Sequence, residues 1–131
     1  MTTTINASTS AGLVQTADTS GIVKLQSNGV TTNALAWINF NGSTSAIRAN
    51  YNIGSITKNA TGDFTLNFTS ALADANYSVS GICSDLTYGA NIYLEGTTYS
   101  TTAVRILTRS GYTATPATGD ATYTCIQVHG N

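Results

Sequence analysis

The sequence has very few charged residues: only 8% of its 131 residues are Asp, Glu, Lys or Arg, against roughly 25% in an average soluble domain. The formal net charge is −1 and basic residues are not clustered, so we expect no nucleic-acid partner. No apolar run reaches the ~18 residues of a spanning helix, so we expect no membrane insertion. The first ten residues lack both the basic and the apolar part of a secretory signal, so we do not expect export by that route.

Side chains with reactive chemistry are scarce as well, since the chain has one His and two Cys. His129 lies close to the C-terminus, where we expect a solvated side chain. A single His per chain supplies too few ligands to predict a metal site. Cys83 and Cys125 fall in segments with a strand pattern; we expect two free, buried thiols, with a cross-strand disulfide as the alternative. We therefore expect no catalytic, metal-binding or cofactor-binding residues, and no enzymatic activity.

Uncharged polar residues take the place of the missing charges. Thr, Ser, Asn and Gly together account for 61 of the 131 residues, and Thr, the commonest of them, fits a pleated β surface. Gly residues recur along most of the chain at intervals of about 8–15 residues, a spacing typical of the turns in an all-β sandwich or barrel. We therefore predict an all-β fold, an antiparallel β-sandwich that is jelly-roll-like or Ig-like.

Alternation of apolar and polar residues predicts the individual strands. In residues 62–69, Phe64, Leu66 and Phe68 share one face with a period of two. Asn41-Gly42 lies between two apolar stretches and predicts a hairpin. The only helix-like piece is one turn at residues 70–75. Further strands are predicted at residues 34–41, 74–83, 90–95, 104–109 and 121–128.

The segment at residues 34–41 is apolar on both faces. Ile38 and Phe40 lie on one side of the predicted strand, and Leu35 and Trp37 on the other. A strand of this kind is either central in a fold or lies at a subunit contact. We expect Leu35 and Trp37 to lie off the main core and to be buried against a symmetry-related copy.

The first 30 residues differ from the rest because they contain few large apolar residues and cannot bury a core of their own. A turn at residues 18–21 is predicted to join two small strands there. We expect residues 1–30 to form an extended N-terminal docking arm held by a neighbour, and residues 31–131 to form the β-sandwich. The predicted subunit contact consists of Leu35 and Trp37 with four residues of the arm: Leu13, Val14, Ile22 and Val23.

Tyrosines are concentrated in the second half of the chain. Tyr combined with Asn, Ser and Gly is the composition of adaptable binding loops. The sequence around Tyr88, at residues 96–99 and at residues 111–119 predicts loops between late strands, so we consider Tyr88, Tyr99 and Tyr112 candidates for receptor-facing loops. Ordinary exposed turns are the alternative.

Residues 36–77 contain a recognisable series of short patterns: W-x-N-F-x-G, I-R-x-x-Y-N, S-I-T, G-D-F-T-x-N-F and D-A-N-Y. This series resembles a recurring domain of tailed-bacteriophage virion proteins of the tail-fibre or tail-fibre-like type. Residues 16–29 also resemble a segment that commonly leads into such domains. The resemblance is carried by Trp37, Asn39, Phe40, Gly42, Ile47, Arg48, Tyr51, Asn52, Ser55, Ile56, Gly62, Asp63, Phe64, Asn67, Phe68, Asp74, Asn76 and Tyr77.

The resemblance implies a β-sandwich that assembles, usually as a homotrimer, and whose N-terminal segment joins it to the rest of the particle. The expected function is that of a bacteriophage virion structural protein, made in the host cytoplasm, with other virion proteins and a host surface glycan or protein as partners. Fibres of this type often have a long shaft, which this sequence lacks, so a capsid decoration protein that stabilises the phage head is the alternative. A carbohydrate-binding module is the less favoured third interpretation.

Overall fold

The computed structural model describes residues 26–27, 30–31, 34–84, 90–110 and 118–130. Within these residues the chain contains strands and no helix. The strands β1 (Gln26–Ser27) and β2 (Val30–Thr31) pair with each other in a small antiparallel sheet of their own. The remainder of the predicted docking arm, residues 1–25, lies outside the described residues, as does the turn predicted at residues 18–21.

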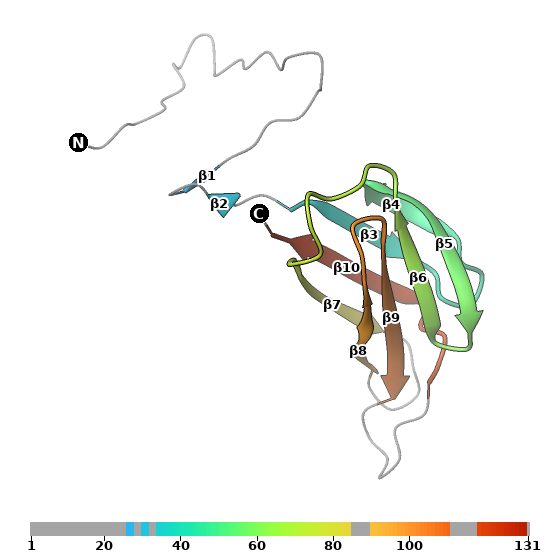
Figure 1. Cartoon of the computed structure of the whole chain (residues 1–131). Coiled ribbons are helices and arrows are strands. Elements are labelled where there is room, and N and C mark those ends of the chain that lie inside the picture. Colours follow the sequence, from blue (N-terminus) through green and yellow to red (C-terminus); the bar gives the residue numbers. More distant parts are fainter. Residues whose placement is uncertain (1–25, 28–29, 32–33, 85–89, 111–117, 131) are drawn as a thin grey trace, which may run out of the picture.

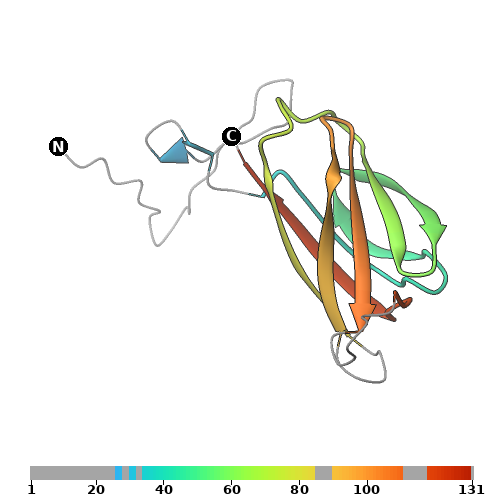
Figure 2. The same ribbon diagram turned by 60° about the horizontal axis from the view of Figure 1, so that its bottom comes forward.

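The other eight strands form two antiparallel four-stranded sheets. Sheet I has the order β4-β3-β10-β7 and consists of β4 (Ile47–Tyr51), β3 (Ala36–Phe40), β10 (Tyr123–His129) and β7 (Ser78–Ser84). Sheet II has the order β5-β6-β9-β8 and consists of β5 (Ile53–Ala60), β6 (Asp63–Phe68), β9 (Ala103–Ser110) and β8 (Ala90–Tyr99). The two sheets stack as two layers (Figures 1 and 2), which confirms the predicted antiparallel β-sandwich.

The core lies between the two layers and is formed by alternate residues of the central strands. On β6, Phe64 and Leu66 are fully buried, as the alternating pattern predicted. The ring of Phe64 packs edge-on against the ring of Phe40 from β3, with 5.1 Å between the ring centroids. The aromatic contact joins the two sheets. The buried cluster contains Ala36, Ile38, Phe40, Ile53, Phe64, Leu66, Phe68, Tyr77, Val104, Ile106, Ile126 and Val128.

Asn52 connects the sheets where the chain passes from β4 in sheet I to β5 in sheet II. Its φ angle is 54°, in the left-handed region that Asn tolerates better than most residues. Its side-chain amide donates to the carbonyl oxygens of Leu35 (3.1 Å) and Ser70 (3.2 Å), and its Oδ1 accepts the N–H of Ser70 (2.8 Å). These hydrogen bonds hold the sharp bend between the two layers.

The hairpin predicted at Asn41-Gly42 is present between β3 and β4, with a longer connection than a two-residue turn. The Asn41 N–H donates to the Ala46 carbonyl (2.9 Å), and Asn41 Oδ1 accepts the N–H of Ser43 (2.9 Å). Gly42 donates its own N–H to the carbonyl of Ala121 (2.8 Å), and a Cβ at Gly42 would lie 2.8 Å from that same oxygen. Glycine is therefore required here by the close approach of another chain segment.

The helical turn predicted at residues 70–75 is wrong, because this segment is an irregular connection between β6 and β7. Leu72 packs against the core, and Asp74 Oδ1 accepts the N–H of Asn76 (2.7 Å) in an Asx turn. The connection ends at the buried Tyr77, whose hydroxyl lies within hydrogen-bond distance of the carbonyls of Ser100 (3.1 Å) and Ala103 (3.2 Å). The irregular path places this ring in the core.

Two further expectations about residue placement are corrected by the structure. Residues 96–99 are the end of strand β8 rather than a loop, and the Tyr99 ring packs against the core with its centroid 5.2 Å from that of Tyr77. Leu35 was expected off the core face, yet its side chain is partly buried against the core and its N–H donates to the Val128 carbonyl (2.8 Å). Leu35 precedes β3, so the alternation of side chains along that strand does not determine the direction of the Leu35 side chain.

Candidate functional site

Large apolar side chains that remain exposed are unevenly distributed over the described part of the chain. All of those whose side chains the structure describes, a set that leaves out residues 85–97, belong to strands of sheet I. A contiguous group of exposed apolar side chains is a mark of an interaction site. They are Trp37 (39% exposed), Ile47 (38%), Tyr51 (47%), Ile82 (72%) and Tyr123 (49%).

The strand register places four of these side chains in rows on the outer face of sheet I. Ile47 is the exception, because it pairs with the core residue Phe40 across a register shift. Trp37 pairs with Tyr51 on β4 and with Gln127 on β10, and Gln127 pairs with Ser80 on β7. Directly paired residues have Cβ atoms about 4.5–5.5 Å apart on the same face of a sheet. Trp37 lies between the buried residues Ala36 and Ile38, so this row faces away from the core.

The next row contains smaller side chains. Asn39 pairs with Ala49 on one side and with Cys125 on the other, and Cys125 pairs with Ile82. Cys125 therefore lies near the middle of the outer face, on the central strand β10. The outer face of sheet I is defined by Trp37, Asn39, Arg48, Ala49, Tyr51, Ser80, Ile82, Tyr123, Cys125 and Gln127.

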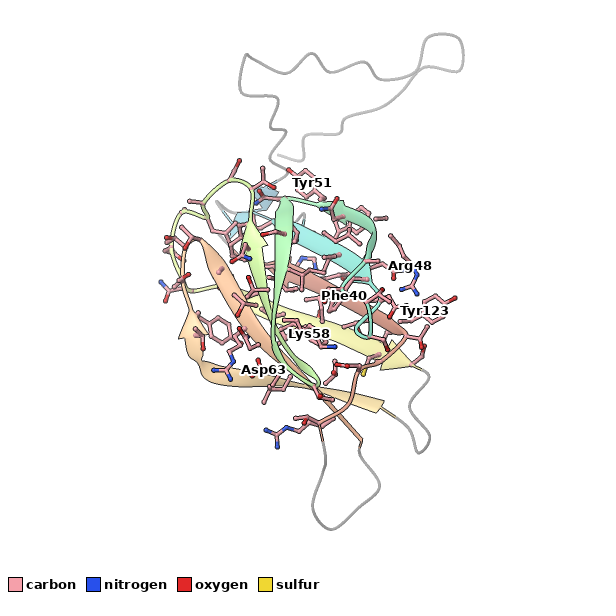
Figure 3. All side chains as sticks on the ribbon, turned by 90° about the vertical axis from the view of Figure 1, so that its right-hand side faces the viewer. Phe40, Arg48, Tyr51, Lys58, Asp63 and Tyr123 are labelled. Carbon is pink, nitrogen blue, oxygen red and sulfur yellow. The ribbon has the colours of Figure 1, made fainter. Side chains whose placement is uncertain are left out.

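Among the described residues, Arg48 is the one charged residue on this face. Its guanidinium carbon lies 4.2 Å from the centroid of the Tyr123 ring, a cation–π arrangement, and its Nη1 donates to Asn39 Oδ1 (3.4 Å). Figure 3 shows Arg48 and Tyr123 projecting together away from the body of the sandwich, whereas Phe40 points between the sheets. The stacked arrangement holds the guanidinium close to the surface of the sheet.

On β5, β6 and β9, polar side chains on the outer face of sheet II bond one another, and the buried Leu107 lies among them. Arg105 donates from Nε to Asp63 Oδ1 (2.8 Å) and from Nη2 to Asp63 Oδ2 (2.5 Å). Asn59 donates to the same carboxylate (3.0 Å). The hydrogen bonds from Arg105 lower the pKa of Asp63 most strongly; burial opposes the shift, and the bond from Asn59 and the charge of Arg105 add to it.

Asn67 continues this polar network along β6. Its Nδ2 donates to the hydroxyls of Ser55 (3.0 Å) and Thr57 (3.1 Å) on the neighbouring strand β5. Thr65 accepts a hydrogen bond from Asn59 in the same way (2.9 Å). Because these groups already bond one another, this face is less suited to gain energy from a partner than the outer face of sheet I.

A third polar group joins the turns at one end of the sandwich. Lys58 Nζ forms an ion pair with Asp120 (2.6 Å) and donates to the Gly42 carbonyl (3.2 Å). Asp120 Oδ1 accepts the N–H of Gly62 (2.8 Å), whose φ of 67° and close neighbour Gly119 leave no room for a Cβ. We assign this cluster a structural role, because its contacts hold the turns at this end of the sandwich in place.

The two cysteines lie on neighbouring strands but on opposite faces of sheet I. Thr124, next to Cys125 in the chain, pairs with Cys83, so Cys83 faces the core while Cys125 faces outward. Both are free thiols, as predicted, and the alternative of a cross-strand disulfide is not formed. Burial raises the pKa of the Cys83 thiol. Cys125 is only half-buried, contrary to the expectation that both would be buried.

Of the predicted site residues, Trp37 lies on the outer face of sheet I, while Leu35 and Tyr99 pack against the core. Sequence reasoning did not single out Tyr123 or Ile82, although alternation in residues 121–128 places Tyr123 opposite the apolar Ile126 and Val128. The other predicted site residues lie outside the described residues: Leu13, Val14, Ile22, Val23, Tyr88 and Tyr112.

Within the part of the chain that the structure describes, no three or more His, Cys, Asp or Glu side chains gather into a group able to hold a metal ion. No helix with the length and apolar character of a membrane span occurs in those residues. Comparison with protein-family models, with curated proteins and with solved structures found no match for this chain.

Proposed function

We propose that this chain is a structural component of a tailed-bacteriophage virion, a tail-fibre-type module that assembles as a homotrimer. Its partners are other copies of itself, other virion proteins and a host surface glycan or protein, and its role is structural rather than enzymatic. The observation that carries the proposal is the exposed outer face of sheet I, which leaves Trp37, Tyr51, Tyr123 and Ile82 in solvent. A sandwich with such a face is suited to be covered by another protein.

The composition of this face supports an assembly role. Trp, Tyr and Arg are the residues that most often dominate the energy of protein–protein contacts. Trp37 and Tyr51 are direct cross-strand neighbours, and Arg48 stacks on Tyr123. Charged residues are depleted in the centres of such interfaces, and Arg48 is the one charged group among the described residues of this face.

The residues that carry the sequence resemblance give further support, because several of them build the framework. Asn52 fixes the crossing between the sheets, Asp63 binds Arg105, and Gly42 allows the approach of Ala121. The resembling pattern therefore corresponds to a framework that presents a surface, which suits a building block of a particle.

The test is the location of the chain in particles of the phage whose genome encodes it. An antibody against the recombinant protein, viewed by electron microscopy with gold labelling, is expected to mark the tail. Particles produced without the gene are the matched control and are expected to carry no label. A label confined to the head would support the decoration protein in place of the fibre module. Particles that lack the chain altogether would contradict the proposed function.

A further inference from the structure

We infer that the outer face of sheet I is the surface through which copies of this chain contact one another, with the faces of neighbouring copies meeting around Cys125. The inference rests on the proposed function, because self-assembly is the role assigned to this sandwich. It specifies which surface is used and which partner covers it. The area, the shape and the charge of the face each favour a second copy over a partner of different chemistry.

The area of the face matches what a specific contact between two copies needs. The exposed parts of Trp37, Tyr51, Tyr123 and Ile82 amount to roughly 400 Å² per copy, if a large side chain offers about 200 Å² when fully exposed. Two copies that meet through this face would cover roughly 800 Å² with these side chains alone. The exposed polar neighbours raise the total past the ~1,000 Å² expected of a specific interface.

The shape of the face is suited to pairing with itself. Its large side chains stand beside short ones: Trp37 pairs with Gln127, whose other neighbour is Ser80, and Ile82 pairs with Cys125. Tall residues of one copy can pack over short residues of a neighbouring copy when every copy turns this face toward the axis of the assembly. A contact of this kind requires no second surface on the molecule.

The charge of the face also favours a second copy. Four carboxylate residues fall within the described part of the chain, and all lie elsewhere: Asp63 and Asp120 form ion pairs, Asp74 lies in the connection before β7, and Glu95 belongs to β8 of sheet II. Covering the face would therefore bury no carboxylate of the described residues. The guanidinium of Arg48 keeps its contacts with Tyr123 and Asn39 when the face is covered. Arg48 lies on the edge strand β4, so its guanidinium can stay in water at the rim of the contact, which keeps the desolvation cost small.

Cys125 provides a native reporter for the experiment, because it lies on this face while Cys83 is buried on the opposite side of the sheet. The purified full chain is treated with a short bis-maleimide and separated under denaturing conditions. We expect a covalent dimer from the wild type and from Cys83→Ser, and none from Cys125→Ser. The Cys125→Ser variant thus controls for cross-linking through any other group.

Variants of the face show whether the cross-link reports a specific contact. Trp37→Ser and Ile82→Ser are each expected to lower the yield of cross-linked dimer about tenfold, which is the effect of losing one well-buried contact residue. Thr65→Ser, on the outer face of sheet II, is the matched control and is expected to leave the yield unchanged. Circular dichroism of each variant confirms that the sandwich is folded.

Three results would overturn the inference. The first is a folded wild type that is monomeric by light scattering at high concentration and gives no cross-link. The second is an oligomer whose Cys125 does not cross-link, which would place the contact on another surface. The third is a monomer that binds a glycan array through Trp37, which would make the face a carbohydrate platform. A cross-linked protein that is absent from phage particles would contradict the proposed function alone, whereas a particle protein without the cross-link would contradict this inference alone.

Discussion

On the outer face of sheet II, Asp63 and Arg105 bond each other through two hydrogen bonds, whereas on the outer face of sheet I the rings of Trp37 and Tyr51 are about half exposed to water. Both faces belong to the same sandwich and cover the same core. The polar face stabilises the folded chain by itself, since its hydrogen-bonding groups find partners within the sheet. The apolar face gains its energy only when another molecule covers it. Under the proposed function, folding and assembly are thus separated onto the two sides of the molecule.

The largest effect on folding is expected at the centre of the polar face. Asp63→Asn removes the charge that Arg105 binds, and we expect it to lower the free energy of unfolding by about 2–3 kcal/mol, because a nearly buried ionic partner is lost. Urea denaturation measures the change. Asp74→Asn, which keeps the Asx turn and breaks no ion pair among the described residues, is the control and is expected to change stability by less than ~0.5 kcal/mol. Equal losses in both variants would contradict this role of sheet II.

Acid should weaken the same contact in the wild type. The pKa of Asp63 lies below its ordinary value of 3.8, mainly because of the hydrogen bonds from Arg105. A carboxyl with a lowered pKa contributes stability above the pKa of the unfolded chain, and that contribution is lost as the pH falls through the folded-state value. We therefore expect the stability difference between wild type and Asp63→Asn to be constant above about pH 5 and to shrink below about pH 4. A difference that persists unchanged into stronger acid would contradict the assignment.

A smaller effect is expected further along the polar face. Asn67→Ala removes the hydrogen bonds to Ser55 and Thr57, and we expect a loss of about 1 kcal/mol in the free energy of unfolding. The loss is limited because water can satisfy the two hydroxyls at this exposed position. Thermal unfolding followed by circular dichroism measures it, with Ser84→Ala, an exposed position on β7, as the comparison. A loss as large as that of Asp63→Asn would show that the network acts as one unit.

The smallest effect on folding is expected on the apolar face. Trp37→Ala removes an exposed ring, and in the isolated monomer we expect a change of less than ~0.5 kcal/mol. Denaturation in a dilute solution, where copies are separated, provides the measurement. A decrease of several kcal/mol in the free energy of unfolding under those conditions would mean that Trp37 stabilises the folded monomer. It would contradict the proposed difference between the two faces.

Local patterns in the sequence predicted strands that bury one face, but they did not predict the exposed strands. The alternation of Phe64, Leu66 and Phe68 gave β6 because one side of that strand is wholly apolar. The strands β4 and β5 were not predicted, since nearly all their residues are exposed and show no periodic contrast. Their positions depend on Asn52 and its hydrogen bonds to distant carbonyls, which no local pattern reveals.

The candidate site was predicted only in part for a similar reason. Trp37 was expected on an outward face because residues 34–41 are apolar on both sides. Its partnership with Gln127, and the presence of Tyr123 and Ile82 beside it, arise from the pairing of β3, β10 and β7, which are far apart in the chain. Register between distant strands is set by tertiary packing, so sequence alone did not assemble this face.

The mass of the folded protein in solution shows whether the outer face of sheet I holds copies of the chain together. Size-exclusion chromatography with light scattering is applied to the wild type and to the double variant Trp37→Ser/Ile82→Ser at equal concentration. We expect the wild type to elute at three times the 13.6 kDa chain mass, as in the proposed assembly, and the double variant to elute as a folded 13.6 kDa monomer. Identical masses for the two proteins would contradict this role of the face.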